Sequence, residues 1–186
     1  MTGNFRKFTK SFPYRNHHFI HMNTSPCHSI TPLNLPPLDV SRLRRRGNAV
    51  EIFDPLRGKH VALTPEEWVR QHFVNYMVTV KGFPTALIAN EIGLTLNGTR
   101  RRCDTVVFDR TGRPMMIVEY KAPGIAVSQR VFDQIVRYNM VLQARYLIVS
   151  NGLSHYCCRI DYSTHSYAFL PELPDFTTCC AENQNR

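Results

Sequence analysis

The order of predicted elements places this chain in the α/β class. A helical pattern covers residues 64–81, three strand patterns separated by turn residues lie between 91 and 121, and a second helical pattern covers 128–142. A continuous apolar run at 146–149 follows, and helix, three strands, helix, strand is the order of a mixed sheet with helices packed on it. With 186 residues, of which 43% are hydrophobic, the chain is long and apolar enough for one domain with its own core.

The first helix has clear start and stop signals. Thr64 can cap the helix, Pro65 suits its first position, and Glu67 completes a capping box. Gly82 ends the helix. The predicted apolar face recurs every three or four residues and consists of Val69, Phe73, Met77 and Val80.

The segment between the helices is read as strands and turns. A short helical turn at 84–89 precedes strands at 91–96, 102–108 and 115–121, and the connecting Asn97-Gly98 and Asp109–Gly112 segments have turn chemistry. Before the first helix, a short strand is expected at Ile52 and Phe53, and the basic cluster of Arg42, Arg44, Arg45 and Arg46 is expected in a loop.

The second helix and the segment after it complete the sheet. Ser128 is expected to cap this helix, whose apolar face consists of Val131, Ile135, Tyr138 and Leu142. The run from Tyr146 to Val149 has the pattern of a buried central strand. Extra C-terminal strands are expected at 156–160 and in a last hairpin that ends near Leu170.

The domain is expected to span residues 38–175. Residues 1–37 read as a basic, irregular tail that contains five prolines, and residues 176–186 read as a disordered C-terminal tail. Met22 lies inside the first segment, so we hypothesise that translation begins either at Met1 or at Met22. The chain is too short to add a helicase motor to a nuclease-sized domain, so any such motor is expected in a separately encoded subunit.

Charge and cysteine content narrow the partners and the compartment. The formal net charge is +9, which favours an anionic partner such as nucleic acid, although a basic tail on a mildly basic domain explains it equally well. The six cysteines include two adjacent pairs and no C-x-x-C, so we expect reduced thiols and a cytoplasmic location. No apolar run reaches the roughly 18 residues of a membrane span, so no membrane partner is expected.

One hairpin carries the candidate chemistry. If its turn is centred between Thr111 and Gly112, Phe108 faces Met115, Val106 faces Ile117, and Asp104 faces Glu119. Opposed side chains have Cβ atoms about 4.5–5.5 Å apart, so two carboxylates there repel each other unless a cation lies between them. Oxygen ligands suit a hard ion such as Mg²⁺, whereas an ordinary charged sheet edge is the alternative.

The same residues resemble a known nuclease signature. Asp104, followed fourteen residues later by Glu119-Tyr120-Lys121, resembles the PD-(D/E)XK motif, with Cys103 where the motif names proline. Gln134 and Tyr138 are similar to the Q-x-x-x-Y element of related restriction enzymes. Over residues 38–175 the chain resembles a stand-alone type I restriction enzyme R protein N-terminal domain, which implies a restriction-endonuclease-like α-β-β-β-α-β core.

The resemblance implies hydrolysis of DNA phosphodiester bonds with Mg²⁺, or Mn²⁺ as a substitute. Asp104, Glu119 and the backbone carbonyl of Tyr120 would ligate the metal, and Lys121 would be the third catalytic residue. Glu91 is similar to an additional acid of the superfamily and a further candidate metal ligand, with a surface residue as the alternative. Gln134 and Tyr138 would be auxiliary, and core packing is an equal alternative for Tyr138.

Basic residues beside this motif are candidates for contact with nucleic acid, and each phosphate contact would steepen the salt dependence of binding by about 0.9. They are Arg100, Arg101, Arg102, Arg130 and Arg137, and a solvated charged run is the alternative for the three consecutive arginines. The expected partners are DNA and a separately encoded restriction or helicase subunit, with a homodimer left open. Alternative functions are a weak or inactive DNA-binding or partner-binding module, a dimeric junction resolvase, and a structural domain; DNA versus RNA, target specificity and activity in isolation stay open.

Overall fold

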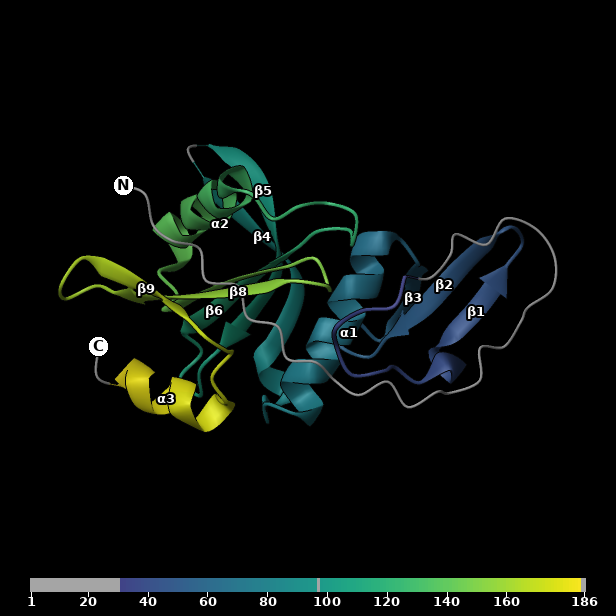
Figure 1. The fold of residues 1–186 in the computed structure, drawn as a ribbon, viewed down its shortest axis with the longest axis horizontal. Coiled ribbons are helices and arrows are strands. Elements are labelled where there is room, and N and C mark those ends of the chain that lie inside the picture. The colour runs from purple at the N-terminus through teal and green to yellow at the C-terminus, as the bar shows by residue number, and fades with distance from the viewer. Residues whose placement is uncertain (1–30, 97, 185–186) are drawn as a thin grey trace.

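A computed structural model describes residues 31–96 and 98–184, which form two sheets and three α-helices (Figure 1). The small sheet has the order β1-β2-β3 and the large sheet the order β4-β5-β6-β7-β8-β9. The helices are α1 (Pro65–Thr79), α2 (Gln129–Leu142) and α3 (Phe176–Gln184). The strands are β1 (Leu43–Arg46), β2 (Ala49–Asp54), β3 (Lys59–Ala62), β4 (Ile88–Leu96), β5 (Thr99–Phe108), β6 (Pro114–Tyr120), β7 (Tyr146–Ser150), β8 (His155–Asp161) and β9 (Ser166–Leu170).

The large sheet is mixed, as the sequence predicts. Its neighbouring strands are antiparallel except for β6 and β7, which run parallel. A parallel pair needs a crossover connection, and α2 supplies it. The order α1, β4, β5, β6, α2, β7 is the predicted core, and β8 and β9 are the extra C-terminal strands.

Two apolar cores cover the two faces of this sheet. On one face, α1 and α3 pack through residues such as Phe73 and Phe176 against Val118 and Ile148. On the other face, α2 packs through Ile135 and its neighbours against another set of strand residues. Strand β7 is buried along its whole length, which confirms the predicted central strand.

Helix α1 begins as its sequence predicts. The Thr64 side chain accepts a hydrogen bond from the Glu67 backbone N–H at 3.0 Å, and Pro65 is the first helical residue. One member of the predicted apolar face differs: Val80 lies at the C-cap and is 47% exposed. Ser128 occupies the N-cap of α2, but its side chain makes no capping hydrogen bond.

The β5–β6 hairpin has the predicted register except near its turn. Val106 pairs with Ile117 as predicted, but Phe108 pairs with Pro114 and not with Met115. The cause is a β-bulge between Val107 and Phe108, which adds one residue to one strand. The bulge lies at the turn end, so it does not alter the register toward Asp104.

The basic cluster is not in a loop. Arg42 ends a short 3₁₀ turn, and Arg44, Arg45 and Arg46 lie in strand β1. Arg44 is directly opposite Glu51 of β2, and their side chains form a salt bridge at 2.7 Å. A cross-strand pair of opposite charges stabilises a strand that has few apolar residues, which explains the wrong loop prediction.

The predicted C-terminal tail instead contains helix α3. Thr177, Thr178 and two cysteines are weak helix formers, so local propensity did not indicate a helix. Tertiary packing supplies the stability: the Phe176 ring lies against Phe83, and the buried Tyr146 hydroxyl donates to Glu182 at 2.7 Å.

The domain also begins before residue 38. Leu33 and Leu35 are each only 5% exposed and belong to the core on the α1 face. The Asn34 N–H donates to the Gly152 carbonyl at 2.8 Å, which fixes this segment beside the turn between β7 and β8. The alternative translation start at Met22 lies outside the described residues.

Two further findings bear on the sequence predictions. The five cysteines in the described part of the chain, 103, 157, 158, 179 and 180, are free thiols, as expected. None of the helices within residues 31–96 and 98–184 is long and apolar enough to cross a membrane.

Candidate active site

Glu119, near the end of β6, is held by two donors. Lys121 Nζ donates to Glu119 Oε1 at 2.8 Å, and Gln134 Nε2 of α2 donates to the same oxygen at 2.7 Å. Gln134 also donates to the Tyr138 hydroxyl at 3.1 Å, since the two residues are one helical turn apart. The predicted cluster of Glu119, Lys121, Gln134 and Tyr138 is therefore assembled in the structure.

Asp104 reaches this cluster from the neighbouring strand β5. Its Oδ2 accepts a hydrogen bond from the Tyr120 backbone N–H at 2.9 Å, so the carboxylate lies against the backbone that follows Glu119. Its Oδ1 accepts from Arg70 Nη2 of α1, also at 2.9 Å. The last paired residues of β5 and β6 on this side are Thr105 and Val118. One position further along the same register, Asp104 lies opposite Glu119.

Burial and charge shift the titration of the pair Glu119–Lys121. Burial, and then the nearby charge of Asp104, raises the pKa of Glu119 to about 7, against the opposing effect of Lys121. Burial alone would lower the pKa of Lys121, but its hydrogen bond to Glu119 and the charge of that carboxylate raise it overall. A buried carboxyl with a raised pKa beside a second acid identifies a functional-site candidate.

The carboxylates suit a hard divalent cation. Both donors to Glu119 use Oε1, and within the described residues its Oε2 has no hydrogen-bond partner. Mg²⁺ is typically bound through one or two carboxylates, with water and substrate phosphate as the other ligands. Asp104 and Glu119 can supply the carboxylates of such a site. Among residues 31–96 and 98–184, no group of three or more His, Cys, Asp or Glu side chains is placed to hold a metal ion.

Glu91 lies near Asp104 but is engaged by arginines. The pairs Asn90–Thr105 and Ile92–Cys103 flank it, so it lies opposite Asp104 on β4. Its carboxylate accepts from Arg70 at 2.7 Å and from Arg102 at 2.6 Å. The structure thus places Glu91 beside the site, while its role as a metal ligand stays a prediction.

Sequence reasoning missed the contribution of α1 to the site. The Arg70 guanidinium, only 7% exposed, contacts Glu67 at 2.8 Å as well as Glu91 and Asp104. Glu67 also contacts Arg57 at 2.5 Å, and Gln71 of α1 donates to Glu67 at 2.8 Å. The sequence did contain a signal: Glu67, Arg70 and Gln71 have helical spacing, so these three polar residues lie on one side of α1, next to its apolar face.

The five arginines proposed from the sequence to contact nucleic acid are all exposed. Arg100, Arg101 and Arg102 lie consecutively on β5 and lead directly to the site. Arg130 and Arg137 lie on α2, the helix that also carries Gln134 and Tyr138.

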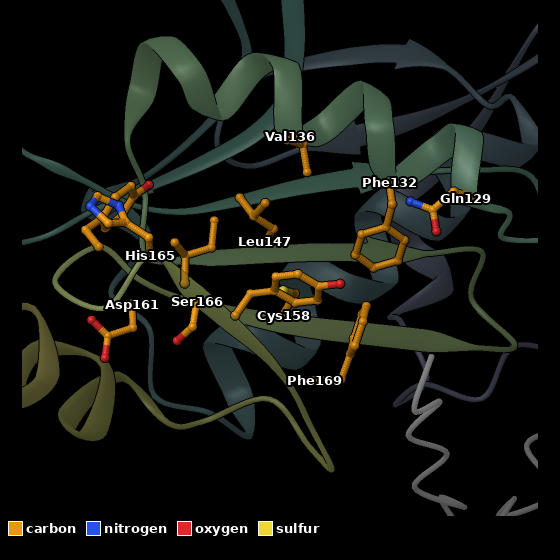
Figure 2. Close-up of a pocket in the computed structure, with 12 residues that line it drawn as sticks. Gln129, Phe132, Val136, Leu147, Cys158, Asp161, His165, Ser166 and Phe169 are labelled. Carbon is orange, nitrogen blue, oxygen red and sulfur yellow. The ribbon is translucent and has the colours of Figure 1, made fainter. Parts of the chain in front are cut away.

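A cavity of about 400 Å³ lies elsewhere, between α2 and the strands β8 and β9 (Figure 2). Phe132 and Val136 project into it from α2, facing Phe169 of β9. None of the predicted site residues lines this cavity. The candidate chemistry is therefore at the carboxylates and not in this cavity.

A mixed sheet between helices, with one acid within β5 and a second acid and a lysine at the end of the adjacent strand β6, defines a nuclease-like α/β domain. Residues 65–174 match the family described as type I restriction enzyme R protein N terminus. The chain belongs to this family. No curated protein matches it.

Two solved structures are similar to the chain. One is a fragment of a protein described as an HsdR subunit of a type I restriction enzyme from Vibrio vulnificus YJ016, with 19% identity, a TM-score of 0.47, and coverage of 66% of this chain. This chain spans only 26% of that fragment. The other is a DUF820 protein from Anabaena variabilis ATCC 29413, described as a nuclease candidate, with 12% identity, a TM-score of 0.42, and coverage of 75% of this chain and 88% of the other.

Proposed function

We propose that this protein is a Mg²⁺-dependent endonuclease that hydrolyses DNA phosphodiester bonds. The observation that carries the proposal is the meeting of Asp104 of β5 with Glu119 and Lys121 at the end of the adjacent strand β6, with the Lys121 ammonium 2.8 Å from Glu119. Family membership supports a nuclease-like module, and these residues supply the specific chemistry.

Asp104, Glu119 and the Tyr120 carbonyl would hold the metal. Mg²⁺, when bound, supplies a Lewis acid for a phosphoryl oxygen and lowers the pKa of a bound water, and Mn²⁺ can substitute for it. Lys121 stands beside Glu119, where its positive charge can offset the charge that develops on the phosphate in the transition state.

The reaction adds one water across one P–O ester bond. The water oxygen bonds to phosphorus, one ester P–O bond breaks, and the departing oxygen takes a proton. Gln134 fixes the Glu119 carboxylate through Oε1, and Tyr138 in turn contacts Gln134, so these two α2 residues act as positioning residues. Holding the carboxylate in one orientation reduces the reorganisation needed during the reaction.

DNA would approach over the exposed arginines, and we propose that Arg100, Arg101 and Arg102 bind its phosphates beside the scissile bond. Arg102 stays 65% exposed despite its ion pair with Glu91, so it remains accessible to a phosphate. Replacing one phosphate-binding arginine by alanine should reduce the slope of log K against log salt by about 0.9. Other parts of a restriction enzyme are the proposed protein partners, because the matched family is named for the N terminus of a type I restriction enzyme R protein.

A plasmid-nicking assay tests the proposal. Wild type, Asp104→Asn and Lys121→Ala are incubated with supercoiled plasmid and either Mg²⁺ or Mn²⁺. Loss of one oxyanion-stabilising or metal-binding group typically costs a factor of about 10² to 10³, so both variants should show almost no nicking. Asp133→Asn is the matched control, since it makes the same chemical change at an exposed residue of α2.

Equal nicking by wild type and both site variants would contradict the proposal. Wild type that binds DNA in a salt-sensitive manner, but never nicks it with either metal, would favour a DNA-binding module. In that case Arg100→Ala should still weaken binding, while Asp104→Asn should not.

A further inference from the structure

Arg70 occupies a central position among three acids, of which Glu67 is buried and Glu91 and Asp104 are partly buried. It belongs to α1, its side chain is 7% exposed, and it passes over the Tyr120 ring at 5.7 Å. Nη1 contacts Glu67 at 2.8 Å and Glu91 at 2.7 Å, while Nη2 contacts Asp104 at 2.9 Å. One guanidinium thus joins three carboxylates from three separate elements.

The three acids depend on Arg70 to different degrees. Glu67 has a second partner in Arg57, and Glu91 has one in Arg102. Among the described residues, Arg70 is the one cationic side chain that forms a salt bridge with Asp104. The buried Nε has no hydrogen-bond partner within the described residues, so the guanidinium is placed by its two Nη groups.

Asp104 therefore stands between two cation positions. On one side is the Arg70 guanidinium, which is always charged. On the other side is Glu119, which lies near Asp104. Within the described residues, Glu119 Oε2 has no hydrogen-bond partner, so this oxygen and Asp104 are the proposed metal ligands there. Two-metal sites place two cations about 3.5–4 Å apart. Here the Arg70 guanidinium already supplies one cationic charge at Asp104.

We propose that Arg70 is the permanent second cation of this site, so that the site takes one divalent ion instead of two. This inference rests on the proposed function, because it assigns the remaining position to the catalytic metal. The guanidinium orients Asp104 through their ion pair, and its positive charge excludes a second metal from the cluster of Glu67, Glu91 and Asp104.

Counting bound Mn²⁺ by electron paramagnetic resonance, on the full chain without DNA, tests the inference. Wild type should bind one Mn²⁺, and Glu119→Gln should lose it. Arg70→Lys, which keeps a cation at this position, should also bind one. Arg70→Met, which removes the salt-bridge partner of Asp104 and one of the partners of Glu67 and Glu91, should bind two.

Thermal unfolding gives a second readout that does not depend on activity. Arg70→Met and Arg70→Gln should have a lower Tm than wild type, because each removes the salt-bridge partner of the partly buried Asp104 and one of the partners of the buried Glu67. Saturating Mn²⁺ should raise the Tm of each by about 5 °C more than it raises that of wild type or Arg70→Lys. Arg70→Gln also removes the charge but keeps a hydrogen-bond donor, so it replaces Arg70→Met in both measurements if Arg70→Met does not fold.

Two outcomes would overturn the inference. One is two Mn²⁺ ions per chain in wild type, and the other is a single Mn²⁺ in folded Arg70→Met with no added metal stabilisation. If wild type bound no Mn²⁺ but Arg70→Met bound one, the catalytic metal of the proposed function would be wrong, while the assignment of Arg70 as the cation of the three acids would stand.

Discussion

Glu91 shows how closely the backbone is constrained next to Asp104. It has a φ of 63°, in the left-handed region that non-glycine residues rarely adopt. Such a conformation costs roughly 1–3 kcal/mol and persists only when surrounding contacts enforce it. Here the ion pairs with Arg70 and Arg102 fix the side chain, so the strain is located at the candidate site.

His72 makes the stability of the fold sensitive to acid. The residue is 5% exposed, and burial lowers its pKa to about 4. In the unfolded chain the His72 imidazole is protonated near pH 6.5, whereas in the folded chain it is protonated only near pH 4. The free energy of unfolding is therefore highest above pH 6.5 and decreases as the pH falls from 6.5 to 4. Between pH 7 and pH 5 this residue should reduce the free energy of unfolding by about 2 kcal/mol.

Urea unfolding of wild type and His72→Gln at both pH values measures this effect. The difference between pH 7 and pH 5 should be smaller in the variant by that amount. His60→Gln is the control, because His60 lies on β3 and is only partly buried. An unchanged pH dependence in His72→Gln would show that His72 does not carry the effect.

At the residue scale, the sequence predicts the part of the site that local geometry determines. Glu119 and Lys121 follow from strand alternation, and Gln134 and Tyr138 follow from helical spacing. Arg70 could not be predicted in the same way, because its hydrogen bond to Asp104 joins residues 34 positions apart on different elements. Only the packing of α1 against the sheet brings the two together.

Capping of α1 gives a prediction at the scale of the element. Thr64→Ala removes the side-chain acceptor for the Glu67 N–H, which should lower the free energy of unfolding by about 1 kcal/mol. Thr79→Ala is the matched control at the exposed other end of α1, where the hydroxyl only donates back to the Asn75 carbonyl. Chemical denaturation of both variants measures the difference, and equal stability would contradict a capping role for Thr64.

Elements were predictable where their own sequence contained the signal. The start of α1 was predicted because Thr64 and Pro65 act locally, and β7 because Tyr146 to Val149 form a continuous apolar run. Helix α3 was not predicted, because its stability depends on the packing of Phe176 and Glu182 against distant parts of the chain. The one local hint was Asp175, whose carboxylate accepts from the Thr178 N–H at 2.8 Å, as an N-cap does.

At the scale of the whole molecule, a row of ion pairs joins the two sheets. Asp54 of the small sheet pairs with Arg57, which pairs with Glu67 of α1, and Glu67 pairs with Arg70. Arg70 then reaches Asp104 in the large sheet. Since these groups are largely buried, salt should screen them much less than surface pairs. The small sheet is therefore part of the support of the site.

The burial of Leu33 and Leu35 predicts how truncation before residue 38 changes the stability of the domain. A chain that begins at residue 38 lacks Leu33 and Leu35, whose burial contributes about 3–6 kcal/mol together. It should therefore unfold at a clearly lower denaturant concentration than a chain that begins at residue 31. Within the longer chain, Leu33→Ala should cost about 2–5 kcal/mol, whereas Val40→Ala, at a residue 60% exposed, should cost little.

Equal unfolding midpoints for the two chains would show that the segment from 31 to 37 adds nothing to the core. Gly152→Ala offers an independent check from the other side of the packing. A Cβ on Gly152 would approach Leu33 Cδ2 to 2.7 Å, and the φ of 81° also disfavours alanine. This variant should resemble Leu33→Ala in stability.

The packing of this N-terminal segment determines when the domain can be completed during synthesis. The Asn34 carbonyl lies 3.2 Å from His155 Nε2, and these two residues are 121 positions apart in the chain. A growing polypeptide therefore cannot complete the packing of the segment that carries Leu33 and Leu35 until β8 has left the ribosome. Contacts between such distant residues form late and slowly, so the nascent chain presents its earliest core residues longest to chaperones and proteases.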